Sequence, residues 1–553
     1  MSEDASSYPP IEPTTFDLIV VGTGVPESVI SASASANGKT VLHLDPNPFY
    51  GSHFASLPLH QLSCFLSSHS TPPPSAASTG CDYTPVALTR RSLYSDIEIS
   101  SYSPEIIGEE HSRKFSIDLC GPRVLFCADK SIDLMLRSGC SQYVEFKSID
   151  ASFVFEENDK KLMSVPDSRA AIFKDRSLGL TEKNQLMRFF KLVQQHLAGS
   201  DDGGGETSKI SAEDLESPFV EFLKKMRLPP KIKSIILYAI AMADYDQENM
   251  EVCEQVLKTK DGIDRLALYN ASVGRFSNAL GALIYPIYGQ GELPQGFCRR
   301  AAVKGCIHVL RMPVIALLMD KGTGRYKGVR LSSGQDLFSQ QLVLDPSYIV
   351  SLPFASSPPE PLKESLKVSD NRDVKWKLAR GICITGSSLR ADTSNLLVVY
   401  PPRSLYPEQV TPIRALQISS DLAVCPLGMF VLYFSALCKD GNEGKRLLHA
   451  AMDALLSLPE SGCPDSGTAV QNEVAAEVKP TILWKALYIQ ELTVDQFESI
   501  STTPIPDGDL NYNNLLDATL KLFQKMYPHE EVFPETASPE NPEDDDNEFS
   551  LES

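Results

Sequence analysis

The residues best suited to chemistry lie in a glycine turn between two apolar runs. Gly22 and Gly24 follow the first run, and Asp45 closes the second. In a dinucleotide-binding unit of the G-x-G-x-x-G type, the glycines bring a pyrophosphate onto a helix N-terminus and the later acid holds a ribose hydroxyl. Here the third glycine position holds Glu27, whose carboxylate would oppose an anionic pyrophosphate. The pattern predicts a Rossmann-like strand–helix–strand unit that has lost its cofactor. A working FAD or NAD site with a tolerated third position is the alternative.

Other catalytic patterns are weak. The nine histidines include no H-E-x-x-H pair, no G-x-S-x-G elbow occurs, and the twelve cysteines never form C-x-x-C pairs. We therefore expect no catalytic residues, no metal site and no disulfide framework. Reduced thiols and an N-terminus without a basic, apolar leader favour a cytosolic protein.

The length of the chain bounds its number of domains, and its net charge limits the kinds of molecule that it can bind. A chain of 553 residues with 42% hydrophobic content can bury a large core and should hold more than one domain. Its 71 acidic residues exceed its 51 basic residues, which gives a formal net charge of -20. Nucleic acids and anionic membranes select clusters of Lys and Arg, so this balance argues against both as partners.

Changes in composition and periodicity predict an α/β chain in which a helical domain interrupts a sheet domain. We expect a discontinuous Rossmann-like sheet domain at 16–120 and 241–530, a helical domain at 121–240, a disordered N-terminus at 1–15, a mobile insertion at 66–112, a loop at 459–479 and an acidic disordered tail at 531–553.

Apolar stripes with helical spacing characterise the middle of the chain. Such stripes are usually core, but several helices rich in Phe and Leu can also enclose a long apolar ligand. The candidate lining residues are Leu186, Phe189, Phe190, Val193, Phe222 and Ile236.

The run YPIYGQGELPQGFCR at 285–299 mixes aromatic residues, glycines and two opposite charges. Glu292 and Arg299 are seven residues apart, which is two helical turns, so both can project from one helix face. This face is either a binding surface or an ordinary solvated surface.

Three segments together resemble conserved blocks of the Rab GDP-dissociation inhibitor and Rab escort protein superfamily. They are LIVVGTGVPESVISASASANGKTVLHLDPNPFYG at 18–51, YPIYGQGELPQGFCR at 285–299 and LDPSYIV at 344–350. The resemblance covers 16–60 and 113–350 well, and 375–530 more loosely. It implies a fold shared with FAD-dependent oxidases but without a catalytic flavin, hence no cofactor. This agrees with the interpretation of Glu27.

The resemblance also implies site residues. Tyr50, Glu292 and Arg299 match positions that contact the switch regions of Rab GTPases, and Arg300 and Val309 lie beside them. The chain departs from the family at Ser52, where glycine is usual, and at Val309, where methionine is usual. In the family, the helical domain accommodates the geranylgeranyl chain of Rab.

Within the superfamily, the length, the insertions and the acidic tail favour the escort branch. Escort proteins present GDP-bound, unprenylated Rab to Rab geranylgeranyltransferase and deliver the product to membranes, as a non-catalytic accessory subunit. Alignment on Gly274 and Arg275 places Tyr269 where an aromatic residue of the family inserts into the transferase α subunit. Two alternatives stay open, namely a GDP-dissociation inhibitor that recycles prenylated Rabs, and a relative of flavin-dependent amine oxidases.

Overall fold

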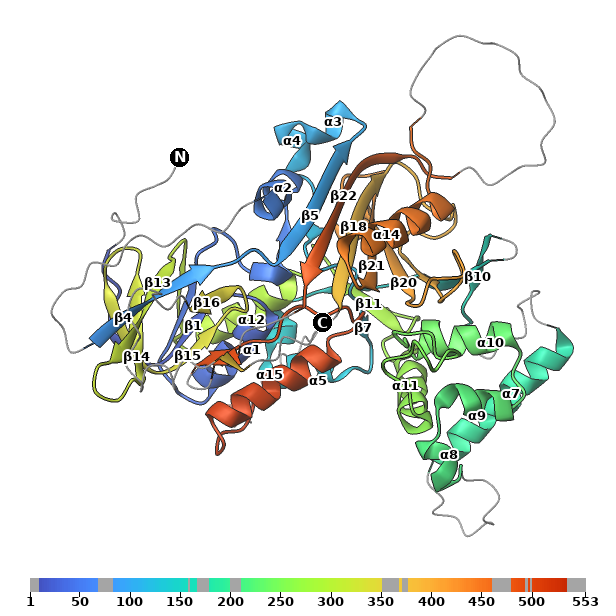
Figure 1. Cartoon of the computed structure of the whole chain (residues 1–553), viewed down its shortest axis with the longest axis horizontal. Helices are drawn as coiled ribbons and strands as arrows, with labels where there is room; N and C mark the ends of the chain where they lie inside the picture. Colours follow the sequence, from blue (N-terminus) through green and yellow to red (C-terminus); the bar gives the residue numbers. More distant parts are fainter. Residues whose placement is uncertain are drawn as a thin grey trace, which may run out of the picture.

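Two large β-sheets and a group of helices make up the computed structural model of the chain (Figure 1). The structure describes residues 9–67, 83–157, 160–166, 179–198, 210–350, 368–369, 376–459, 479–492, 496–497 and 500–534. In these residues no helix combines the length and the apolar character needed to cross a membrane.

The first sheet contains the strand–helix–strand unit predicted from the glycine turn. Four parallel strands lie in the order β12 (Ile307–Leu310), β2 (Val41–Asp45), β1 (Thr15–Val21) and β15 (Asp336–Leu344). The sheet continues antiparallel through β14 (Tyr326–Leu331), β13 (Val314–Asp320), β4 (Tyr83–Arg90) and β16 (Tyr348–Val350), and β24 (Ser501–Thr502) pairs with β15. The parallel half therefore brings the carboxyl ends of β1, β2 and β12 to one edge, where ligand sites of such folds form.

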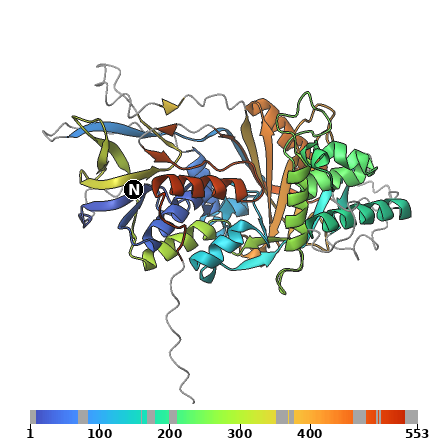
Figure 2. The same cartoon turned by 90° about the horizontal axis from the view of Figure 1, so that it is seen from below.

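Helices cover one face of this sheet. They are α1 (Val25–Ala36), α5 (Lys130–Ser138), α12 (Glu292–Val303) and α15 (Asn513–Met526). Their apolar sides meet Leu18 and Val20 of β1 in one hydrophobic cluster, because alternate residues of a strand point to the same face. In Figures 1 and 2, α15 lies beside α1, as their contacts require. This layer fixes α12 beside the glycine turn.

The second sheet is mostly antiparallel. Its order is β10 (Lys161–Ser164), β9 (Ala151–Glu156), β19 (Leu396–Tyr400), β20 (Ile413–Ser419), β21 (Phe430–Cys438), β18 (Lys377–Thr385), β22 (Ile482–Glu491) and β5 (Tyr94–Ser101). Helix α14 (Gly441–Leu455) packs on one face. The opposite face carries Tyr433 and Leu416, which join the apolar side chains of the helical part in one cluster.

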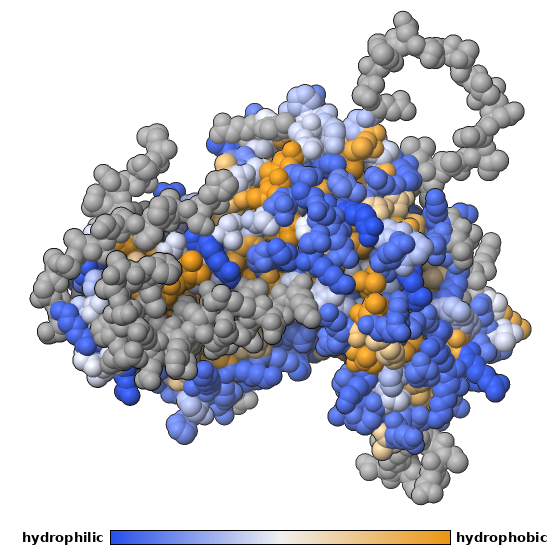
Figure 3. Space-filling model, in the orientation of Figure 1, coloured by the Kyte–Doolittle hydropathy of each residue, from blue (hydrophilic) through white to orange (hydrophobic). Residues whose placement is uncertain are grey.

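The helical part comprises α7 (Leu180–Leu197), α8 (Ala212–Glu216), α9 (Phe219–Lys225), α10 (Pro230–Ser234), a π-helical turn (Ile235–Ile240) and α11 (Thr259–Ser272). A buried arginine ties it to the second sheet, since Arg414 of β20 donates to the carbonyl of Met242 at 3.0 Å and to Asp244 at 2.7 Å. The outer surface of these helices is mostly hydrophilic (Figure 3).

Shorter elements connect these parts. They are β3 (Ser56–Leu57) with β6 (Ile117–Asp118), the small sheet of β7 (Leu125–Phe126), β11 (Leu283–Pro286) and β8 (Phe146–Ser148), β17 (Val368–Ser369) with β23 (Gln496–Phe497), the helices α2 (Leu59–Ser67), α3 (Pro104–Ile107) and α4 (Glu109–Ser112), and 3-10 turns at Ser52–Phe54, Cys140–Gln142 and Ser420–Leu422. The predicted α/β class, with a Rossmann-like unit and an added group of helices, is confirmed.

Parts of the predicted organisation are wrong. Within the supposed mobile insertion at 66–112, β4 pairs with β13 and β5 pairs with β22. Alternating apolar residues such as Ile97 and Ile99 signal a strand, but the Ser/Pro-rich composition nearby obscured them. The supposed helical domain at 121–240 contains β8, β9 and β10, and its helices continue to α11. In the supposed tail, Phe533 is buried against Phe297.

The supposed disordered N-terminus is also partly wrong, because Ile11 is buried, its amide donates to Gln335 at 2.9 Å, and β1 begins at Thr15. The other predictions of disorder cannot be compared with the structure. Residues 1–8, 68–82, 460–478 and 535–553 lie outside the described residues.

Candidate functional site

The glycine turn has the shape of a dinucleotide site, but its interior is filled by the chain itself. Gly22 adopts φ +102°, and a Cβ there would stand 2.7 Å from that of Asp345, so only glycine fits. A Cβ on Gly24 would stand 2.5 Å from a carboxyl oxygen of Glu27. Glu27 therefore occupies the mouth of α1, where a pyrophosphate would bind.

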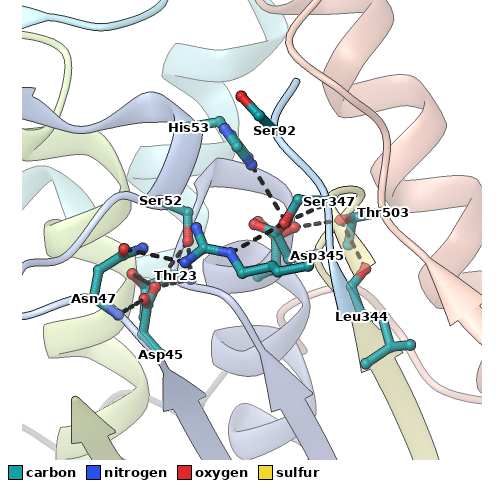
Figure 4. Close-up of polar contacts among 12 residues, drawn as sticks. Thr23, Asp45, Asn47, Ser52, His53, Ser92, Leu344, Asp345, Ser347 and Thr503 are labelled. Carbon is teal, nitrogen blue, oxygen red and sulfur yellow. Dashed lines mark hydrogen bonds and ion pairs between the residues drawn. The ribbon is translucent and has the colours of Figure 1, made fainter. Parts of the chain in front are cut away.

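The surroundings of Glu27 favour the neutral acid over the carboxylate. Burial and the neighbouring Asp345 raise its pKa from 4.5 to about 8. Thr503 is hydrogen bonded to Glu27. It is also hydrogen bonded to the carbonyl oxygen of Leu344 (Figure 4). The Glu27 side chain therefore fills the site, and its buried setting disfavours the charge that the sequence alone suggested.

Asp45 is also satisfied from within the chain. Its carboxylate accepts hydrogen bonds from the Thr23 amide at 2.9 Å, the Thr23 hydroxyl at 2.6 Å and the Ser52 hydroxyl at 2.8 Å (Figure 4). Those hydroxyls take the place of a ribose. The residues present do not fit a bound dinucleotide, which removes the FAD or NAD alternative.

The structure shows how Ser52 can replace the glycine that is usual at this position in the family. Its φ of +45° is a left-handed conformation that favours glycine. In compensation, its hydroxyl donates to Asp45 and accepts from the Thr23 amide at 2.9 Å. The serine thus keeps the backbone shape of a glycine and adds two hydrogen bonds.

Tyr50 and α12 form a surface next to this filled site. The ring centroid of Tyr50 lies 6.1 Å from that of His308, and burial raises the pKa of its half-buried phenol. Glu292 opens α12, where an acid is favoured by the helix dipole, and accepts from the Gln295 side chain at 3.2 Å. Burial raises the pKa of Glu292, and exposed Arg299 opposes this shift, so the two charges interact.

Arg300 and Val309 are directed elsewhere. The Arg300 guanidinium lies against the end of α5, because a Cβ on Gly139 would be 3.5 Å from its central carbon. Val309 packs in the cluster on the face of the first sheet away from α12, whereas neighbouring His308 faces Tyr50. The structure therefore groups Glu292 with Arg299, and separates Val309 from the Tyr50 side of β12.

Tyr269 lies on α11 and is half-buried. Its ring meets that of Phe126 edge-on at a centroid distance of 6.5 Å. One turn earlier, Arg265 donates to the carbonyl of Ala241 at 2.7 Å, which holds α11 to the π-helical turn. Part of the Tyr269 ring therefore stays accessible on a well-anchored helix.

The six apolar candidates of the helical part pack against one another. Phe189 contacts both Phe190 and Phe222, with ring centroids 5.7 and 6.5 Å apart. All six belong to the largest hydrophobic cluster or pack against it, and they are Leu186, Phe189, Phe190, Val193, Phe222 and Ile236. A long apolar ligand would enter this cluster only if the helices moved apart.

Sequence analysis missed a cavity of about 400 Å³ near Tyr50. Its lining includes Phe49, His60, Phe65, Arg90 and Arg91. Arg90 ends β4 and Arg91 follows it in the connection to β5, within the stretch expected to be a mobile insertion. In the sequence, the signal for this cavity is the pair Arg90-Arg91 at the end of the strand-like run 83–90.

Comparison with known proteins agrees with this architecture. The family model described as GDP dissociation inhibitor matches residues 12–85 and 78–455. The chain is 59% identical, over 99% of both chains, to Rab escort protein 1 of Arabidopsis thaliana. It is 28% identical to Rab proteins geranylgeranyltransferase component A of Drosophila melanogaster, over 96% of this chain and 91% of that protein.

A solved structure shares the fold. Rab GDI of Plasmodium falciparum superposes with a TM-score of 0.66, covering 94% of this chain and 99% of that chain, at 20% identity. The family match, the long relatives and the shared fold lead to one conclusion: this chain belongs to the GDP dissociation inhibitor family.

Proposed function

We propose that this chain is an escort factor that binds GDP-bound, unprenylated Rab GTPases and presents them to Rab geranylgeranyltransferase. The observation that carries the proposal is the 59% identity with a Rab escort protein over 99% of both chains. The chain acts as a non-catalytic accessory subunit. It acts in the cytosol and delivers the prenylated Rab to membranes.

Rab binds at the surface formed by Tyr50, Glu292 and Arg299, whereas Arg300 and Val309 point away from it and are weaker candidates. A half-buried tyrosine beside two opposite charges suits recognition of a protein surface, since Tyr and Arg dominate interface energies. Selectivity for GDP follows if this surface reads switch loops whose order depends on the γ-phosphate.

The transferase α subunit binds at α11 through Tyr269. The ring is half-buried against Phe126 and its helix is anchored by Arg265, so its position is fixed before binding. A fixed aromatic anchor loses little conformational freedom on association.

The helical part holds the geranylgeranyl group after transfer. Each methylene removed from water contributes about 0.8 kcal/mol, so a 20-carbon chain needs a large apolar enclosure. The cluster around Phe189 and Phe222 supplies apolar surface once the helices separate.

The test is geranylgeranylation of GDP-loaded Rab by the purified transferase heterodimer, with and without this chain. We expect prenylation only in its presence. R299E should lower Rab affinity roughly tenfold or more, whereas K304E, an exposed charge reversal just beyond α12, should not. Y269A should impair prenylation without weakening Rab binding, and N270A on the exposed side should be neutral.

A GDP-dissociation inhibitor is the second candidate, favoured by the family match and the shared fold. It predicts extraction of prenylated Rab from membranes without stimulation of prenylation. That result would overturn the escort proposal. Absence of both activities would contradict Rab carriage altogether.

A further inference from the structure

Three potential metal ligands meet beneath Tyr50, outside the surface proposed for Rab. His43 lies on β2, His308 on β12 and Cys298 on α12. His43 and His308 are paired residues on adjacent parallel strands, with ring centroids 4.9 Å apart. One ligand atom from each of the three residues lies within 4.8 Å of the other two. His43 and Cys298 are buried, and His308 is half-buried.

The His43 imidazole is held in the way that metal-bound histidines are held. The Nε2 of His43 meets the carbonyl oxygen of Gly22, which only accepts, so Nε2 carries the proton. Its Nδ1 therefore offers a lone pair, and within the described residues that buried atom has no hydrogen-bond partner. Metal ligands commonly have such a carbonyl on the second ring nitrogen, because it fixes tautomer and orientation. The Cys306 backbone lies near enough to the His308 ring to raise its pKa, although burial lowers that pKa more.

The donor set selects the ion. Two neutral imidazoles and a thiolate suit Zn²⁺, whereas Mg²⁺ and Ca²⁺ prefer oxygen ligands. Donors around tetrahedral zinc stand about 3.5 Å apart, so side-chain shifts of about 1 Å would close the cluster. The Cys306 sulfur lies 3.9 Å from the His308 Nε2.

We propose that His43, Cys298 and His308 form a Zn²⁺ site under Tyr50. Binding converts the Cys298 thiol to a thiolate, and the proton passes to solvent. Because the ligands come from three elements, no C-x-x-C or His-x-His spacing reveals them. The expectation of no metal site, drawn from cysteine spacing, does not extend to such a discontinuous site.

The test uses the full chain, stripped of metal and dialysed against Zn²⁺, with bound metal measured by mass spectrometry after desalting. We expect about one zinc per chain. C298S and H308A should each weaken zinc binding about 100-fold or more in competition with a chromophoric chelator. C383S, a buried cysteine in the second sheet, and H449A on α14 are the matched controls and should bind as the parent chain does.

Co²⁺ substitution gives a readout that needs no variant. A thiolate-to-cobalt charge-transfer band in the parent chain supports the site, and its loss in C298S assigns the sulfur. The proposal is overturned if the parent chain retains no zinc, if the cobalt complex lacks this band, or if C298S and H308A both bind zinc as the parent chain does. Circular dichroism of the metal-free variants establishes that they are folded.

Discussion

At the scale of single residues, Glu27 links stability to pH. In the folded chain the pKa of the Glu27 carboxyl group is raised to about 8, whereas in the unfolded chain it has its ordinary value of 4.5. The folded state therefore binds more protons in this interval, and the free energy of unfolding falls as pH rises. From pH 6.5 to 8 we expect a loss on the order of 1 kcal/mol from this group, measured by denaturant unfolding at each pH.

The neutral isostere E27Q provides the comparison. It cannot titrate, so its stability should fall by less over the same interval, and the difference between the two curves isolates Glu27. Parallel curves for the two proteins would show that Glu27 is ionised in the folded state.

The sequence revealed the loss of the third glycine, but it could not reveal what Glu27 does. Its pKa depends on Asp345 and its hydrogen bond on Thr503, which lies 476 residues away in the chain. Likewise, Ser52 could be seen as a departure from glycine, whereas its bonds to Asp45 and Thr23 required the folded turn. Local motifs identify such positions, and tertiary contacts decide their chemistry.

At the scale of elements, close packing of α9 on α11 depends on Gly262. A Cβ at this position would stand 2.5 Å from the ring of Phe219. Alanine normally stabilises a helix relative to glycine by about 1 kcal/mol. Here G262A should instead destabilise by about 1–2 kcal/mol, because overpacking outweighs the gain in propensity.

Hydrogen exchange measured by mass spectrometry locates this effect. Peptides from α9 and α11 should exchange faster in G262A, while those of β1 and β2 should not. G108A is the control, because a Cβ there would be in ordinary contact at 3.5 Å from the Glu105 carbonyl oxygen. Unchanged exchange in α9 and α11 would mean that the two helices already adjust to a methyl group.

Where the apolar residues recur with a clear period, the sequence predicted the type of element correctly. It predicted the boundaries of those elements less accurately. The stripes of Phe189 and Phe222 correctly indicated α7 and α9. Strands β4 and β5 were not predicted, because pairing with β13 and β22 in two different sheets orders them, not their local composition. The candidate site shows the same difference. The sequence placed Glu292 and Arg299 on one helix, α12, but it did not indicate the cavity beside Arg90.

At the scale of the whole molecule, the helical part and the second sheet share one hydrophobic cluster and the Arg414 link. We therefore expect them to unfold together rather than as separate domains. Native-state hydrogen exchange should give α9, β20 and β21 the same denaturant dependence for their slowest amides. Opening of α9 at clearly lower denaturant would identify an independent unit, and would revise the shared core.

The filled glycine turn has a consequence for how the folded protein is maintained. A protein that binds a dinucleotide gains stability in proportion to the logarithm of the free cofactor concentration, so its abundance follows cofactor supply. In this chain the hydrogen bonds that a bound dinucleotide would form are made by the chain's own side chains, namely those of Glu27, Thr23 and Ser52. Its folded population should therefore stay the same in flavin-starved and flavin-replete cells.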